Sequence, residues 1–149
     1  MILLDALYAA AATLGFGVLF NIRGRSLGLA TLGGSAGWLV YLLVFSLTQG
    51  PATSIFLAAL FIGLYAEITA HIFKKPATLF IVCAIIPLVP GGGMYYSMLY
   101  ALHGEADRAL STLFQTLTFA GAIAAGVALA ASVSRGFFSL LAHRAQGKT

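Results

Sequence analysis

Charged residues are the scarcest class in this chain of 149 residues: they make up 8% of it, against 60% hydrophobic residues. A soluble domain carries about 25% charged residues, so this composition excludes an ordinary soluble fold. The chain also lacks a basic face or a nucleic-acid-binding motif, which argues against a nucleic-acid partner. The sequence therefore predicts an all-α polytopic protein that lies in the lipid bilayer.

Cysteine and the usual catalytic patterns are scarce as well. Cys83 is the single cysteine, so an internal disulfide is excluded, and its apolar neighbours favour a packing role. The three histidines lie far apart along the chain, and no P-loop, dinucleotide fingerprint or Ser-His-Asp order occurs. We therefore expect that the protein is not an enzyme and that it holds no metal ion and no cofactor.

What the chain has in abundance is long apolar runs. A transmembrane helix needs about 20 predominantly apolar residues. The runs of about this length are residues 2–20, 27–47, 52–73, 77–102 and 109–133. We therefore predict a single integral-membrane domain, residues 1–149, with five transmembrane helices.

The few charges indicate the orientation of these helices. An odd number of spans places the termini on opposite sides, and the basic turns at 21–25 and 74–76 then share a side with the C-terminal tail. Arg108 is the exception among the eight Lys and Arg residues. Because cytoplasmic loops carry the excess of Lys and Arg, we expect the N-terminus outside and the C-terminus in the cytoplasm, in a bacterial inner (plasma) membrane.

The fourth apolar run is interrupted at Pro87–Gly93. Pro87 and Pro90 each remove a backbone donor and clash with the preceding helical turn. The glycines that follow each lower helix propensity by roughly 1 kcal/mol relative to alanine; they are Gly91, Gly92 and Gly93. The sequence therefore predicts that the fourth transmembrane helix is broken at this segment.

A broken helix in lipid needs protein or a water-filled cavity around its backbone polar groups. In transporters such half-helix ends bind substrate near the membrane midplane. A half-helix that starts after Gly93 would direct free N–H groups at an anion. We therefore expect the segment to bind a small carboxylate substrate through Pro87, Pro90 and the three glycines; the alternative is a kink that serves helix packing.

Two polar side chains near the break are further candidates for substrate binding. Tyr95 can hydrogen-bond the substrate, or it can belong to the aromatic belt at the membrane surface. Gln115 shares one face of the fifth run with Ser111 and Thr118. These residues can line a polar path, or they can bond to a neighbouring helix.

Glu67 is an acidic residue in the interior of the third apolar run. Carboxylates inside membrane segments are rare and often relay protons, so Glu67 is our candidate for proton coupling. The alternative follows from its position near the cytoplasmic end of the run. There it can reach the membrane surface or pair with His71, four residues further on.

Four short sequences follow one another along the chain: Gly15–Asn21 (GFGVLFN), Phe61–Glu67 (FIGLYAE), Lys75–Thr78 (KPAT) and Ile86–Gly91 (IPLVPG). In this order and spacing they resemble the small membrane component of the threonine/serine exporter (ThrE) family. The resemblance implies proton-driven export of threonine and serine by an antiporter, or of a dicarboxylate such as succinate, as in some split members. It also implies that a larger membrane subunit of the same family works with this chain.

Two other functions stay open at this level. The chain can be a non-transporting membrane scaffold, in which case the break at Pro87–Gly93 is a packing device. It can also be a homo-oligomer that forms a channel, which its small-residue pairs such as Gly33 and Gly37 favour.

Overall fold

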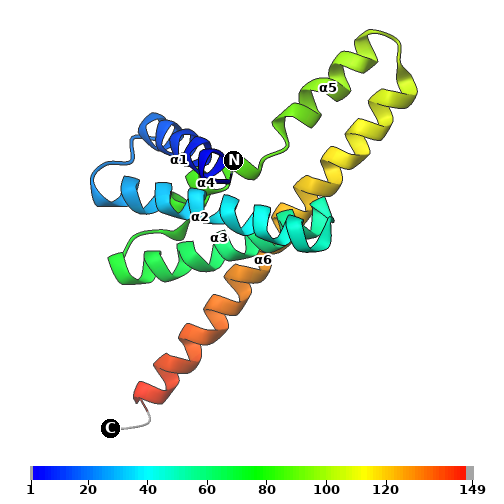
Figure 1. The fold of residues 1–149 in the computed structure, drawn as a ribbon. Helices are drawn as coiled ribbons and strands as arrows, with labels where there is room; N and C mark the ends of the chain where they lie inside the picture. Colours follow the sequence, from blue (N-terminus) through cyan, green and yellow to red (C-terminus); the bar gives the residue numbers. More distant parts are fainter. Residues whose placement is uncertain (1, 147–149) are drawn as a thin grey trace.

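The computed structural model describes residues 2–146, with side chains described for residues 4–136. The elements are α1 (Ile2–Leu19), α2 (Arg25–Thr48), α3 (Pro51–Phe73), α4 (Ala77–Ala84), η1 (Ile86–Leu88), α5 (Gly91–Leu102) and α6 (Ala106–Gln146). The described part of the chain contains helices and no strands (Figure 1). The predicted all-α fold is confirmed.

Three helices are long and apolar enough to cross a membrane: α2, α3 and the 106–136 part of α6. The helices on either side of the break make a fourth apolar unit, Ala77–Leu88 with Gly91–Leu102, which is bent by 53°. The described part of α1, Leu4–Leu19, is apolar but shorter. Length and composition thus support three to four of the predicted spans, with α1 as a shorter fifth apolar helix.

Helices α1 to α4 lie together as one bundle, which α6 crosses along α3 (Figure 1). After the break, α5 leaves this bundle and pairs with the first half of α6, so that the two form a hairpin that projects from it (Figure 1). Helix α6 runs far beyond the predicted end of the fifth span at residue 133. Along the chain, the broken segment is the joint that connects α4 of the bundle to α5 of the hairpin.

Glycines let the bundle helices approach closely. A Cβ atom on Gly126 of α6 would lie 2.7 Å from the Phe56 carbonyl oxygen and 2.9 Å from the Leu60 amide nitrogen of α3. A Cβ atom on Gly33 of α2 would lie 2.7 Å from the ring of Tyr65. Small residues at helix contacts are a general means of packing in membranes; here Gly33 lets α2 approach α3, and Gly126 lets α6 approach α3.

The two basic turns meet at one end of the bundle (Figure 1). Lys75, in the turn between α3 and α4, donates a hydrogen bond from Nζ to Ser26 Oγ at 2.7 Å. Ser26 is buried in the first turn of α2, directly after Arg25. This contact agrees with the expectation that both turns share one side of the membrane; which side is cytoplasmic stays a prediction.

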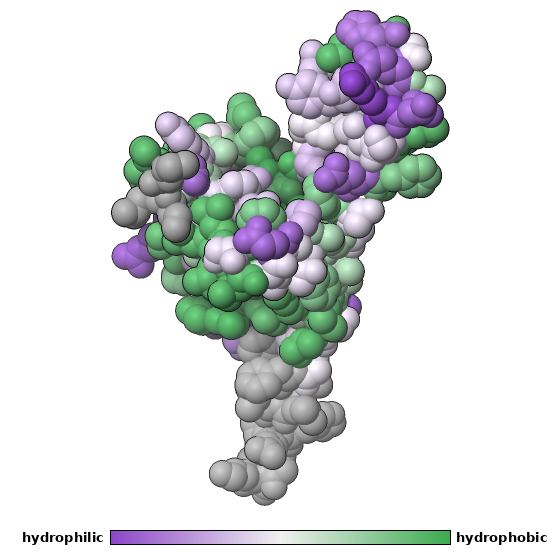
Figure 2. Space-filling model, turned by 45° about the vertical axis from the view of Figure 1, so that its right-hand side comes forward, coloured by the Kyte–Doolittle hydropathy of each residue, from purple (hydrophilic) through white to green (hydrophobic). Residues whose placement is uncertain are grey.

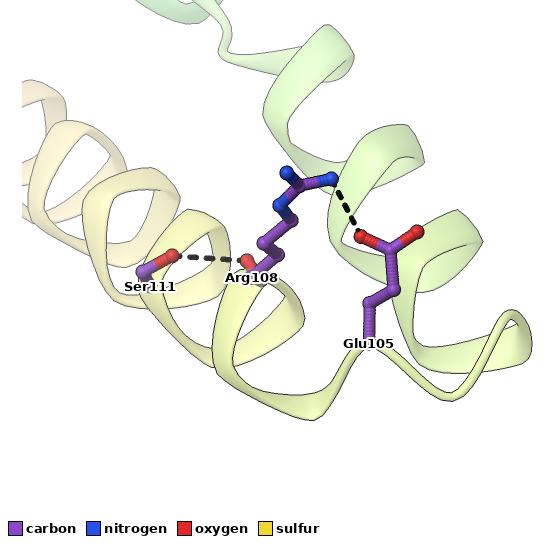
Figure 3. A network of polar contacts seen from close by, with 3 residues as sticks. All are labelled: Glu105, Arg108 and Ser111. Atoms are coloured by element: carbon purple, nitrogen blue, oxygen red, sulfur yellow. Dashed lines mark hydrogen bonds and ion pairs between the residues drawn. The ribbon is translucent and has the colours of Figure 1, made fainter.

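The tip of the α5–α6 hairpin is hydrophilic, whereas much of the body in the same view is apolar (Figure 2). At this tip Arg108 forms an ion pair with Glu105 at 2.7 Å (Figure 3). The Ser111 hydroxyl donates to the Arg108 carbonyl oxygen at 3.0 Å (Figure 3). Both charged side chains are exposed, so the pair adds little to stability.

The break is confirmed, but it lies earlier than the sequence predicted. Helix α4 ends at Ala84, one short turn follows, and α5 begins at Gly91 and not after Gly93. The glycines have no positive φ angle and form the first turn of α5. The first amides of this turn have no intrahelical partner, and Pro90 lies just ahead of it as the N-cap residue.

Candidate functional site

A cleft of about 350 Å³ lies where the broken segment faces α2, α3 and α6. It is lined by Trp38, Tyr41, Ile55, Pro87, Leu88, Val89, Pro90, Gly93, Thr112, Gln115, Thr116 and Phe119. The volume is in the range of small-molecule sites. None of these lining residues is charged, so hydrogen bonding and shape, not ion pairing, decide what the cleft can hold.

The start of α5 supplies free backbone donors next to the cleft. The hydrogen-bond ladder of α5 begins with the Met94 amide, which donates to the Pro90 carbonyl oxygen at 3.2 Å. The amides of Gly92 and Gly93 come before this first bond, so they have no partner within the helix. A carboxylate at this helix end would accept from them and gain from the helix dipole.

The other side of the break supplies free acceptors. In a continuous helix the Gly91 amide would donate to the Pro87 carbonyl, but here it donates to the Val89 carbonyl oxygen at 2.8 Å. Within the described residues, the carbonyl oxygens of Pro87 and Leu88 accept no hydrogen bond. Unwound carbonyls of this kind bind cationic groups in transporters. The segment thus offers donors and acceptors within a few residues.

Gly93 differs from the two glycines before it. A Cβ atom on Gly93 would overlap Thr116 Oγ1 of α6, whereas one on Gly91 or Gly92 would meet nothing within 4 Å. Thr116 is buried, and its hydroxyl donates to the Thr112 carbonyl oxygen at 2.7 Å. Gly93 is therefore the glycine that the close approach of α5 to α6 requires.

The structure brings together some of the residues that the sequence singled out. Those that line the cleft are Pro87, Pro90, Gly93 and Gln115. Tyr95 lies outside the lining, on an exposed face of α5, with its ring edge-on to Tyr96 at 5.3 Å. Gly91 and Gly92 also lie outside the lining, so the cleft uses residues 87–90 and Gly93 of the predicted segment.

On α6, only one of the three polar residues expected to share a face reaches the cleft. The hydroxyl of Ser111 donates to the Arg108 carbonyl at 3.0 Å, and that of Thr118 donates to the Phe114 carbonyl at 2.9 Å. Such bonds satisfy the hydroxyl within its own helix. Gln115 lines the cleft, and its amide can both donate and accept.

Trp38 is a cleft residue that the sequence analysis missed. Its ring lies 5.0 Å from the ring of Tyr41, one turn further along α2. Its Nε1–H is buried and has no hydrogen-bond partner among the described residues. One signal was available: tryptophan favours the membrane–water interface, whereas Trp38 lies in the middle of the 27–47 run.

Glu67 lies away from this cleft. It lines a separate cavity of about 520 Å³ at the turn between α3 and α4, together with His71, Lys74 and Lys75. Ile55 is the cleft residue on the same helix, and Glu67 lies 12 positions further along it, a helix rise of about 18 Å. A small solute in the cleft therefore cannot touch the Glu67 carboxylate.

The fold and the cleft define a class: a polytopic membrane protein in which a broken helix borders an uncharged polar site, an arrangement typical of secondary transporters. The protein-family model described as "Threonine/Serine exporter, ThrE" matches residues 5–133. The chain belongs to the threonine/serine exporter (ThrE) family, as the sequence resemblance predicted. This membership supports a transporter role.

The comparison with curated proteins adds a more distant relative. An uncharacterized protein of Haemophilus influenzae is 27% identical over 136 residues, which are 86% of this chain and 46% of that protein. The chain thus spans about half the length of the curated relative it matches. No solved structure matches this chain.

Proposed function

We propose that this chain is a membrane subunit of a secondary exporter that moves threonine or serine out of the cell. The observation that carries the proposal is the uncharged cleft at the break, in a chain of the ThrE family. Free amides at Gly92 and Gly93 complement a carboxylate, and free carbonyls at Pro87 and Leu88 complement an ammonium group. An amino-acid zwitterion presents both groups, and its net charge of zero suits a cleft without charged side chains.

A dicarboxylate such as succinate is the less favoured substrate. A dianion in a membrane-embedded site needs cationic partners, because the loss of its hydration is costly. The described lining of the cleft offers none. The hydroxyl of threonine or serine, in contrast, can bond to the amide of Gln115, which both donates and accepts.

We propose Glu67 as the residue that carries the coupled proton. Because it lies about 18 Å along α3 from the cleft, coupling would act through the alternation of two conformations and not through direct contact with the solute. Glu67→Gln keeps the shape but loses the exchangeable proton. It is expected to abolish export driven by a proton gradient while exchange of labelled for unlabelled L-threonine continues.

The matched control for that variant is Glu105→Gln, which removes an exposed acid at the hairpin tip. Proteoliposomes with an imposed pH gradient measure both activities. Gradient-driven export that persists unchanged in Glu67→Gln would remove Glu67 from the mechanism.

A larger membrane subunit of the same family is the partner we propose. The Haemophilus influenzae relative contains more than twice the length that this chain matches, so a single chain there holds additional sequence. In the present chain α5 packs mainly against α6, which leaves the other faces of α5 for a partner.

Efflux from whole cells tests the proposal. Cells that produce the larger subunit are loaded with L-threonine, L-serine or succinate, and efflux is measured with and without this chain. We expect threonine and serine efflux only when both proteins are present. Succinate efflux alone would select the dicarboxylate alternative. Efflux without partner and gradient would indicate a self-assembled channel, and an assembled complex without efflux would indicate a scaffold.

A further inference from the structure

A second cavity adjoins the cleft. It measures about 250 Å³ and is lined by Asp5, Tyr8, Ala9, Ala12, Trp38 and Pro87. Four of these residues, Asp5 to Ala12, belong to α1, which contributes nothing to the lining of the cleft. Trp38 and Pro87 line both cavities. These two residues are therefore the wall that the cavities share.

This wall consists of one fixed and one movable part. Pro87 belongs to η1, which packs against both α1 and α2, and its ring restricts the backbone. Trp38 contributes an indole that packs against the core cluster containing Leu88 and lies tilted against the ring of Tyr41. A rotation of the indole about its side-chain bonds would connect the two cavities without unfolding any helix.

The hydrogen-bonding state of Trp38 points to a polar group that passes the wall. Its buried Nε1–H has no acceptor in the described part of the chain. A buried donor without a partner is costly, and such groups are rare in native proteins unless they have a specific role. A carboxylate that passes between the cavities would satisfy this donor.

We propose that the cleft and the α1 cavity are consecutive chambers of one pathway, and that Trp38 is the gate between them. Its Nε1–H binds the carboxylate of the passing solute. Asp5 is the charged residue of the α1 chamber, where its carboxylate accepts from the ammonium group. This inference rests on the proposed function and adds to it a second binding station and the residue that controls access to it.

Fluorescence tests the binding step directly, because Trp38 is the single tryptophan of the chain. The complex with the larger subunit is reconstituted in lipid nanodiscs and titrated with L-threonine. Subtraction of the same titration with Trp38→Phe isolates the emission of Trp38. We expect a saturable change in this difference signal. A constant signal, at concentrations that saturate transport, would overturn the proposal.

Transport assays test the gate. In proteoliposomes Trp38→Ala opens the wall and is expected to raise the gradient-independent leak of L-threonine several-fold. Trp38→Phe keeps the ring but loses the donor, so the leak stays low while KM rises about tenfold, the effect of one hydrogen bond to a charged group. Leu39→Ala, a truncation of the adjacent exposed side chain on α2, is the matched control.

Two results would overturn the gate while the exporter stands: a Trp38→Ala leak equal to that of Leu39→Ala, or a Trp38→Phe variant with wild-type KM. The second measurement decides the matter if Trp38→Ala does not fold. Failure of the proposed function is seen separately, as absent L-threonine efflux from the wild-type complex.

Discussion

The α1–α4 bundle and the α5–α6 hairpin are packed in opposite ways. In the bundle, small side chains such as Ala30, Ala58 and Ala66 are fully buried, and glycines bring backbones into contact. On α5, Ser97 is the buried residue, and Leu102 is 74% exposed. The bundle thus satisfies its own packing, whereas α5 has little packing besides α6.

This difference explains where the cleft lies. It forms at the joint of the two regions, between the well-packed α2–α3 pair and the projecting hairpin. Helix α5 joins the bundle through the 85–90 break and packs mainly against α6, so a change at this joint can move α5 while the bundle and the crossing of α3 with α6 stay intact. We therefore expect substitutions in the bundle to act on folding and those at the joint to act on transport.

The largest effect is expected where the bundle meets α6. Gly126→Leu would drive a side chain into the backbone of α3 at Phe56 and Leu60. Overpacking typically costs about 1–3 kcal/mol, and the cost is at the upper end here because the backbone of α3 must move. Thermal unfolding in detergent measures it. Gly121→Leu, where a Cβ meets nothing within 4 Å, is the control; equal stability of the two variants would contradict this account of the crossing.

At the joint, Gly93→Ala is expected to lower transport about tenfold or more while the complex still forms. The added methyl displaces Thr116 and moves the start of α5 against α6, and misplacement of a site by about 1 Å can cost 100-fold in rate. Gly91→Ala, with open space around it, is the control. Efflux together with co-purification of the larger subunit measures both properties. Joint loss of assembly and transport in Gly93→Ala would favour the packing role of the break.

A smaller effect is expected from Gln115→Leu, which keeps the side-chain size but removes the polar amide from the cleft. Loss of a hydrogen bond of about 1 kcal/mol raises KM for L-threonine several-fold. Thr118→Val is the control, because the Thr118 hydroxyl is bonded to its own helix. A wild-type KM in the Gln115 variant would exclude its side chain from substrate binding.

The smallest effect is expected at the hairpin tip. Arg108→Gln breaks the ion pair with Glu105, but both side chains are exposed, and such pairs contribute about 0–1 kcal/mol. Thermal unfolding at low and high salt measures the change. A larger loss of stability would show that the tip is coupled to the rest of the fold, contrary to its separation from the bundle.

Local chemistry made the broken helix predictable. Proline removes a donor wherever it lies, so Pro87 and Pro90 indicated the break without any tertiary information. The exact start of α5 was not predictable from propensity, because the low helix propensity of glycine does not exclude it from a helix, and Gly91, Gly92 and Gly93 form the first turn of α5. The role of Trp38 was missed for a different reason: periodicity does not say which neighbour a buried side chain will meet.

The sequence by itself determined the membrane setting, the helical class, the family and the place of the break, since all of these depend on composition and on residues close together in the chain. Only the tertiary structure decided that Gly93 alone of the three glycines at the break is required, that Gln115 and Trp38 line the same cleft, and that Glu67 lies elsewhere. These facts depend on which helix faces pack together. That choice is made by contacts between residues far apart in sequence, such as Gly126 against α3.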